Sequence, residues 1–463
     1  GTLSLLGMYS DLHYQTPGGI TLAQYQTDPK LARQPTATLP GSEAQKATIY
    51  TKVAFIGGNY QLQLSDHWTQ SHALYLSTND FTNPFISNYE KRDEQGFGGR
   101  NVWQNTSKWG EIPTNWTTGF EWQYGKSAQR NYDNTGGIPA DIQTAEDITS
   151  SNLSVFSQLE AVVFPTLTLS AGLSYNTFKY KYERFVASPY VQDARSFDGI
   201  LIPRFALNKT FADTWALVAS YSSGYSPPTL QEVRPSAGGF RRDLNAEKGG
   251  NVELGMRKFT KHFSAEINAY QFQLKESIVR RSDESGSEYF VNAGRTRQQG
   301  LEWAVAYDFK INPNFPGIFK VWHQGTLSKY IFKDYVNGTT DISNKEIPGV
   351  PRFTQTTGID ALLPYGVSAY VSYQHGGSFY LNDANTIENT PYNQWTAKVA
   401  WKKSCSKNLY SELSASAEKV NAGIYSLGYD LNAFGNRYYN AAPKNNVWAG
   451  LKLGWEWGKS VRN

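Results

Sequence analysis

The chain is poor in cysteine and methionine and has no long apolar run. Its 463 residues include one Cys and two Met. Cys405 therefore cannot form an internal disulfide, and we expect it to occupy a turn. No stretch approaches the ~18 consecutive apolar residues that a membrane helix needs, and the mean hydropathy is −0.52. These shortages exclude an internal disulfide and a helical membrane protein.

Aromatic residues are abundant instead, at 14%, with 30 Tyr and 13 Trp. The run VWAGLKLGWEW at 447–457 carries an apolar side chain at every odd position. A period of two indicates a β-strand, because successive side chains point to opposite faces. This run is about twice the five or six residues common for strands. The same alternation recurs at 167–175, 301–309, 367–374 and 395–402, so the sequence predicts an all-β chain.

The connections between these segments alternate between short and long. Short turns are expected at 65–67, 164–165, 208–213, 260–262, 364–365 and 404–408. Long polar connections are expected at 16–45, 81–97, 131–150, 183–199, 223–250, 333–350, 376–392 and 420–445. The chain then contains roughly eighteen strands, and the asymmetry is typical of outer-membrane barrels, whose turns are short at one end and long at the other.

The two faces of each strand distinguish a barrel from a sandwich. A sandwich or propeller buries its apolar faces in a shared core and uses shorter strands. In a membrane barrel the apolar face meets lipid, aromatic residues lie at the interfaces, and the polar face lines the lumen. We therefore predict an antiparallel transmembrane β-barrel. The side chains that we expect to face the membrane are Leu451, Leu453, Trp455, Trp457, Trp303, Trp395 and Trp401.

The same parity rule places charged residues. Glu253 and Arg257 oppose Val252, Leu254 and Met256, which directs them into the lumen, where they contact an internal domain or are solvated. Arg295 and Arg297 share parity with Leu301 and Trp303, so a regular strand directs them outward above the apolar band. A role at lipid headgroups or lipopolysaccharide is the better interpretation for this pair.

Motifs for other chemistry are sparse. The formal net charge of +4 is close to neutral for this length and gives no case for a nucleic-acid partner. The six His residues are dispersed, without the spacing of a metal site. No nucleophile elbow or phosphate-binding glycine loop is present. We expect no enzymatic activity, no metal site and no cofactor. A barrel protease or lipase is the rival class, but its known barrels are smaller and no catalytic constellation is found.

Four segments in the latter half carry a resemblance to a known family. They are YSSGYSPPTLQEVRP at 221–235, LNAEKGGNVELGMR at 244–257, NAGRTRQQGLEW at 292–303 and the segment 430–457. Together they resemble the barrel of TonB-dependent outer-membrane receptors. TPGGITLAQYQTDPKLAR at 16–33 is similar to an early loop of the ferric-siderophore branch, particularly ferric-citrate receptors.

The resemblance implies a 22-stranded barrel of which this chain holds about the last eighteen strands. The family's N-terminal plug, its TonB-binding segment and the first strands are not found, so we expect residues 1–463 to form a partial barrel from a longer gene product. The family usually ends on an aromatic residue, whereas here GKSVRN follows Trp457.

The resemblance also implies a function. Such receptors bind a scarce chelate at extracellular loops and move it inward with energy relayed through TonB. We therefore expect a monomeric outer-membrane receptor for a ferric siderophore or similar iron chelate, with lipopolysaccharide around it and the ferric chelate as cargo. Alternatives are another cargo, such as an oligosaccharide, cobalamin or another metal chelate, and a passive porin.

Basic loop residues are the candidates for binding an anionic, oxygen-rich chelate. They are Arg234, Arg241, Arg242, Lys248, Arg280 and Arg281. The alternative is that they are ordinary solvated loop charges or contacts to lipopolysaccharide phosphates.

Overall fold

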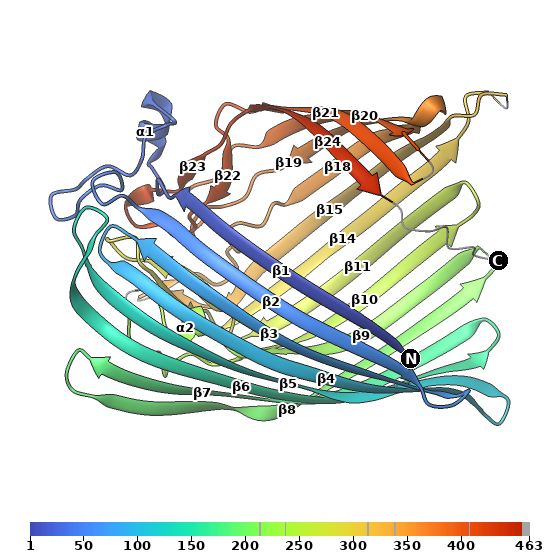
Figure 1. Cartoon of the computed structure of the whole chain (residues 1–463), viewed down its shortest axis with the longest axis horizontal. Coiled ribbons are helices and arrows are strands. Elements are labelled where there is room, and N and C mark those ends of the chain that lie inside the picture. The colour runs from blue at the N-terminus through green and yellow to red at the C-terminus, as the bar shows by residue number, and fades with distance from the viewer. Residues whose placement is uncertain (213, 237, 313, 338, 407, 456–463) are drawn as a thin grey trace.

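The computed structural model describes residues 1–455 except 213, 237, 313, 338 and 407, and shows one large antiparallel sheet (Figure 1). The predicted all-β class is confirmed. In this described part, eighteen strands form the sheet. They are β1 (Thr2–Gln15), β2 (Thr48–Gln63), β3 (Trp68–Pro84), β4 (Tyr89–Trp109), β5 (Ile112–Asn134), β6 (Pro139–Phe164), β7 (Leu167–Val186), β8 (Val191–Phe211), β9 (Trp215–Ser226), β10 (Glu247–Phe259), β11 (Phe263–Lys275), β14 (Arg295–Phe309), β15 (Ile318–Asp334), β18 (Phe353–Leu362), β19 (Val367–Gly376), β20 (Tyr392–Ser404), β21 (Leu409–Asn421) and β24 (Asn445–Trp455).

Each strand pairs with the next strand of the sheet along the chain, as an up-and-down meander. The sheet curves into a wall that is consistent with a β-barrel (Figure 1). Within the described residues, no ladder joins the edge strands β1 and β24. The two edges approach at the loop end, where an isolated antiparallel bridge joins Ile20 to Tyr439.

Small elements lie in the connections between these strands. They are α1 (Leu22–Thr27), α2 (Leu230–Val233), the 3₁₀ turns Pro364–Gly366 and Phe434–Asn436, and the short strand pairs β12 (Ile278–Ser282) with β13 (Glu288–Asn292), β16 (Val336–Asn337) with β17 (Thr340–Asp341), and β22 (Ser426–Tyr429) with β23 (Tyr439–Ala441). Each α-helix is only about a turn long and starts with a capping box, Thr21 with Gln24 and Thr229 with Glu232. In the described part of the chain, no helix is both long and apolar enough to cross a bilayer.

The predicted short turns at 65–67, 164–165, 260–262, 364–365 and 404–408 fall at connections between consecutive strands of the sheet, whereas most of 208–213 belongs to β8, which continues to Phe211. Cys405 lies in one of them and is exposed. The predicted loops 81–97, 131–150 and 183–199 are wrong. Strands β3 to β8 continue through most of these residues and leave only the connections 85–88, 135–138 and 187–190.

The reason for this error is the environment of the strand ends. In these stretches charged side chains occupy both parities, as Glu90 and Arg92 do on one face and Lys91 and Asp93 on the other, so the alternation that identifies a strand disappears while the backbone ladder continues. In β4, for example, Arg92 lies 3.5 Å from both Glu90 and Glu94 in ion pairs that all occupy one face. The ladder between β3 and β4 extends to the pair Pro84 and Tyr89.

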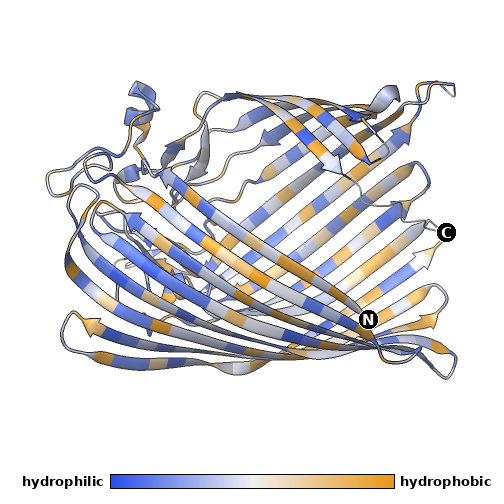
Figure 2. Cartoon of the chain, in the orientation of Figure 1, coloured by the Kyte–Doolittle hydropathy of each residue, from blue (hydrophilic) through white to orange (hydrophobic). Residues whose placement is uncertain are grey.

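Register shows that each face keeps one chemical character across several strands. One row joins Ile359, Val371, Ala397, Ala417 and Val447 through direct cross-strand pairs. The opposite face carries the row Glu266, Ala304, Gln324, Thr356, Gln374 and Gln394. Figure 2 shows apolar and polar blocks alternating along the strands.

Compact packing is found at the loop end of the sheet, where three clusters of buried apolar residues lie. One gathers Ile148, Tyr180, Tyr182, Phe197 and Val233. The second joins the first long connection to the last ones through residues such as Ile20, Tyr25, Leu381 and Tyr439. The third contains Ala293, Phe332, Tyr335 and Ile342. These clusters hold the long connections together as one layer, which we call the loop layer.

Candidate ligand-binding site

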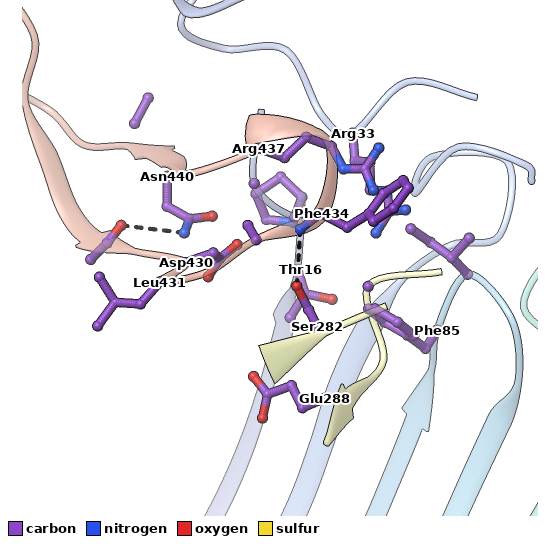
Figure 3. A pocket seen from close by; sticks show the side chains of 18 of the residues that line it. Thr16, Arg33, Phe85, Ser282, Glu288, Asp430, Leu431, Phe434, Arg437 and Asn440 are labelled. Atoms are coloured by element: carbon purple, nitrogen blue, oxygen red, sulfur yellow. Dashed lines mark hydrogen bonds between the residues drawn. The ribbon is translucent and has the colours of Figure 1, made fainter. Parts of the chain in front are cut away.

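A half-open cavity of about 840 Å³ lies between the loop layer and the end of β1 (Figure 3). Its walls come from four parts of the chain that are far apart in sequence: residues 14–19 with Arg33, residues 85–86, residues 280–288, and residues 428–443. The cavity is in the size range of small-molecule sites. It is therefore the candidate binding site.

Tyr25 fixes the first connection against the last. Its hydroxyl donates to the carbonyl oxygen of Tyr425 at 2.9 Å and accepts from the amide of Tyr425 at 3.0 Å. The amide of Ile20 donates to the carbonyl oxygen of Tyr439, and the amide of Tyr439 donates to the carbonyl oxygen of Ile20. These bonds join residues that are about 400 positions apart, and they hold the two sides of the cavity together.

Arg33 is buried in the cavity wall. Its two terminal nitrogens donate to the carbonyl oxygens of Ser285 and Glu284, each at 2.8 Å. Arg437 donates to the same Glu284 carbonyl at 3.1 Å. Two guanidinium groups thus converge on one turn, residues 283–287, between β12 and β13.

Gly286 makes this convergence possible. Its φ is +84°, and a Cβ at this position would lie 2.1 Å from a terminal nitrogen of Arg33. We expect Gly286→Ala to destabilise the turn by about 1–2 kcal/mol from the left-handed backbone alone, and to displace Arg33 as well. Faster hydrogen exchange at the amides of Gly286 and Ser287, which bond within the turn, would be the measured result. Gly239→Ala is the control. Gly239 also has a positive φ, but no atom lies within 4 Å of a Cβ placed there, so this variant measures the backbone strain without the crowding.

The cavity has an excess of positive charge. Arg33, Arg280 and Arg437 face two carboxylates, Glu288 and Asp430. Arg280 lies 2.7 Å from Glu288 and 3.9 Å from Asp430. Burial, together with repulsion by Arg437, lowers the pKa of Arg33 to about 10, so it stays charged at neutral pH. Burial also lowers the pKa of Arg437.

Apolar side chains complete the site. Phe85, Leu431 and Phe434 line it beside the polar groups (Figure 3). The amide of Phe434 donates to the Ser282 hydroxyl at 3.2 Å, which ties the last connection to β12. A pocket with several guanidinium groups and apolar walls suits an organic anion, because guanidinium pairs with carboxylate through charge-assisted hydrogen bonds.

The structure brings only one of the predicted ligand residues, Arg280, into the cavity lining. Arg281 lies behind the wall, in a buried ion pair with Asp383 at 2.7 Å and in contact with Tyr335. Arg234 is fully buried between Glu146, at 2.6 Å, and Glu90, at 3.5 Å. Both groups are held inside the loop layer, away from its surface.

The other three predicted residues lie elsewhere. Arg241 pairs with Asp243 at 2.6 Å, and Arg242 pairs with Asp193. Lys248 is not in a loop. It lies in β10 with an unbroken register and the parity of Val252 and Leu254, so its side chain leaves the sheet on the apolar face.

Arg33 and Arg437 were missed as site residues, although both lie in segments that carry the family resemblance, 16–33 and 430–457. What the sequence does not show is that these segments meet. Their contact depends on the packing of the loop layer, which no local pattern encodes.

The lumen candidates lie on the polar face. Arg257 pairs with Glu266 of β11 at 3.0 Å, and Glu253 accepts a bond from Asn251 at 2.6 Å. Their contact with an internal domain stays a prediction. Among the described residues, no group of three or more His, Cys, Asp or Glu is placed to hold a metal ion.

The membrane-facing candidates lie on the apolar face. Leu451, Leu453 and Trp455 are exposed on β24. Trp395 and Trp401 are exposed on β20, and Trp303 on β14 is half-buried. Trp457 lies outside the described residues. That these side chains contact lipid stays a prediction.

Comparison with known proteins agrees with this architecture. The family described as "TonB dependent receptor-like, beta-barrel" matches residues 1–427. Among solved structures, the ferric citrate transporter FecA, in its unliganded form, has a TM-score of 0.76 at 14% identity over 98% of this chain and 67% of its own. The siderophore receptor PiuA from Acinetobacter baumannii has a TM-score of 0.72 at 13% identity over 97% and 72%. The ferric yersiniabactin uptake receptor FyuA from Yersinia pestis has a TM-score of 0.66 at 13% identity over 98% and 68%.

The curved antiparallel sheet, with short turns at one end and a loop layer at the other, defines an outer-membrane receptor of the β-barrel class. The chain belongs to the TonB-dependent receptor family, in its β-barrel part. TonB-dependent receptors are bacterial outer-membrane proteins, and this chain is placed in that membrane. The family and these neighbours are receptors and transporters.

Proposed function

We propose that the intact protein takes up a ferric siderophore or a ferric-citrate-like chelate across the outer membrane. The observation that supports this most strongly is the cavity in the loop layer, where Arg33, Arg280 and Arg437 surround a space of about 840 Å³. Ferric chelates with carboxylate or other oxygen donors are often anionic, and guanidinium groups pair with such groups in fixed geometry. The similar structures add support, since they are those of a ferric citrate transporter, a siderophore receptor and a ferric yersiniabactin uptake receptor.

We further propose that transport is coupled to TonB. Residues 1–463 then form a partial, monomeric barrel, which a plug domain and about four more strands complete to twenty-two. Glu253 and Arg257 contact the plug in this arrangement, and the apolar face bearing Leu451 and Trp395 contacts lipid. A receptor with the same fold for another cargo, such as an oligosaccharide, cobalamin or another metal chelate, is the alternative, and a passive porin is the remaining one.

A binding experiment on the full-length receptor distinguishes these cargoes. Fluorescence quenching titrations should show saturable binding of ferric citrate or another ferric chelate, and much weaker binding of the iron-free chelator. Uptake of radioactive iron by cells should stop when TonB is deleted. A receptor that binds no ferric chelate contradicts the iron assignment, and constitutive ion conductance in planar bilayers would indicate a porin.

The pH dependence of binding follows from Asp430. Burial raises the pKa of this carboxyl, and Arg280, the Asn440 hydrogen bond and Arg33 oppose that rise only in part. As pH falls from 7 toward 5, Asp430 begins to lose its charge while the arginines keep theirs, so the cavity becomes more positive. We expect affinity for an anionic chelate to rise by about threefold, the size associated with one partly exposed charge. The Asp430→Asn variant, titrated at both pH values, should not show this rise in affinity. If its affinity rises by the same factor, the effect comes from titration of the chelate itself.

A further inference from the structure

The candidate cavity has less free polar capacity than its three arginines suggest. Both terminal nitrogens of Arg33 donate to carbonyl oxygens of the turn 283–287, each at 2.8 Å. Arg280 is paired with Glu288 at 2.7 Å. A guanidinium group that already donates to the wall has few donors left for a ligand. Most of the arginine hydrogen bonds are therefore made within the protein.

Other polar side chains of the lining are occupied in the same way. The Ser282 hydroxyl accepts a backbone amide at 3.2 Å, and the Asn440 side-chain amide donates to the carbonyl oxygen of Gly428 at 3.2 Å. Arg437 is different. It donates one hydrogen bond, from Nη2 to Glu284, and its Nε and Nη1 have no hydrogen-bond partner among the described residues. Arg437 is therefore the guanidinium group best able to pair with an anionic group of a ligand.

The charge of the cavity indicates a ligand of low charge. Three arginines and two carboxylates line it, which leaves one positive charge in excess. A ligand with a single negative charge is neutralised there, whereas each further charge stays unpaired in a partly desolvated site. Ferric complexes of catecholates and of citrate carry several negative charges, and those of trihydroxamates carry none. Neither extreme matches the excess of one.

The rest of the wall is apolar and partly open to solvent. Phe434 is 50% exposed, although it is a large aromatic side chain. Phe85 and Leu431 line the space beside it and come from a different connection and the same connection, respectively (Figure 3). Covering such a surface with apolar ligand atoms is favourable, and a wholly polar chelate cannot make use of it. The cavity therefore favours a ligand with an apolar part.

We propose that the cargo is an amphiphilic ferric chelate, with one net negative charge and an apolar arm. Arg437 pairs with the anionic group, and Phe85, Leu431 and Phe434 cover the arm. This inference rests on the proposed function, which assigns a ferric chelate to the cavity, and it names the class of chelate. It ranks ferric citrate, which is wholly polar and more highly charged, among the weaker ligands.

The test uses the full-length receptor and two synthetic chelators with the same iron-binding groups. Both are citrate diamides that carry two N-acyl hydroxamates, and the acyl groups are acetyl in one and butanoyl in the other. Both ferric complexes have a single net negative charge, so they differ only in apolar surface. Burial of one butanoyl chain covers two more CH₂ groups, and each contributes about fourfold in affinity. Fluorescence quenching should therefore show about fifteenfold tighter binding of the butanoyl complex.

Variants locate the source of this preference. Phe434→Ser removes the exposed ring but keeps the backbone amide that bonds to Ser282, so the preference should fall to about threefold or less. The matched control is Phe185→Ser, which removes an aromatic ring of similar exposure, 48%, at the loop end of β7 and outside the cavity lining. Its preference should stay unchanged. Arg437→Gln should weaken both complexes by the same factor, because their charge is equal.

The outcomes separate this inference from the proposed function. Equal affinity for the two complexes, or tighter binding of ferric citrate than of the butanoyl complex, would overturn the inference and leave uptake of a ferric chelate standing. An unchanged preference in Phe434→Ser, or an equal loss in Phe185→Ser, would also overturn it. A receptor that binds none of these ferric complexes contradicts the proposed function and the inference together. Heat-dependent mobility on gels reports folding, and Phe85→Ser replaces Phe434→Ser if that variant fails to fold.

Discussion

Replacing Arg234 by Gln is expected to cost the loop layer about 3–5 kcal/mol, because it leaves Glu146 buried without its cation. The two side chains are 0% exposed and lie 2.6 Å apart. Glu146 also accepts bonds from the Tyr182 hydroxyl at 2.6 Å and from the amide of Gly239 at 3.2 Å, so the carboxylate organises the whole connection from β9 to β10. Burial raises the pKa of Glu146, but Arg234, the Tyr182 hydroxyl and the Gly239 amide together more than offset this and favour the ionised form.

Local unfolding is the quantity to measure. Hydrogen exchange at the amides of Arg234 and Arg241, which bond within this connection, should accelerate by about 100-fold or more for a loss of 3 kcal/mol. Arg241→Gln is the matched control, since its partner Asp243 is exposed and such pairs contribute at most about 1 kcal/mol.

A double variant checks the cause. Adding Glu146→Gln to Arg234→Gln removes the uncompensated charge while keeping an acceptor for Tyr182, so part of the lost stability should return. If the losses of local unfolding free energy in Arg234→Gln and Glu146→Gln simply add in the double variant, the ion pair is not what stabilises this connection.

Replacing Arg437 by Gln is expected to weaken binding of the anionic chelate by about 10- to 100-fold. A hydrogen bond from a charged donor contributes about 1.5–3 kcal/mol, and glutamine removes the charge and shortens the side chain while keeping an uncharged donor. Arg437 is a better target than Arg33, because Arg33 donates two hydrogen bonds to the wall itself and its loss would alter the cavity.

Arg242→Gln is the control for this experiment. It removes an equal charge from the loop layer outside the cavity, at a residue that the sequence had made a candidate for ligand contact. Fluorescence quenching titrations with ferric citrate and a hydroxamate chelate compare the three proteins. Weaker binding in Arg242→Gln with unchanged binding in Arg437→Gln would move the site away from the cavity.

Sequence reasoning was accurate wherever the two faces of a strand meet different surroundings. The alternation at 301–309 and 447–455 identified strands, and the same parity rule put Glu253 and Arg257 on one face and Leu451 on the other. It failed at 81–97, 131–150 and 183–199, where polar and charged residues occur on both faces and interrupt the alternation. Ladder hydrogen bonds hold those strands, and backbone bonds leave no mark on side-chain composition.

The sequence by itself determined that the chain is an antiparallel sheet with one apolar and one polar face, because a period of two is a property of neighbouring residues. The tertiary structure alone decided which basic residues share a site. Arg33 meets the turn at 284–286 across some 250 residues, and Arg437 reaches the same turn only through the packing of the loop layer. Contacts of this kind depend on how distant segments pack, and electrostatic interaction depends on distance in space.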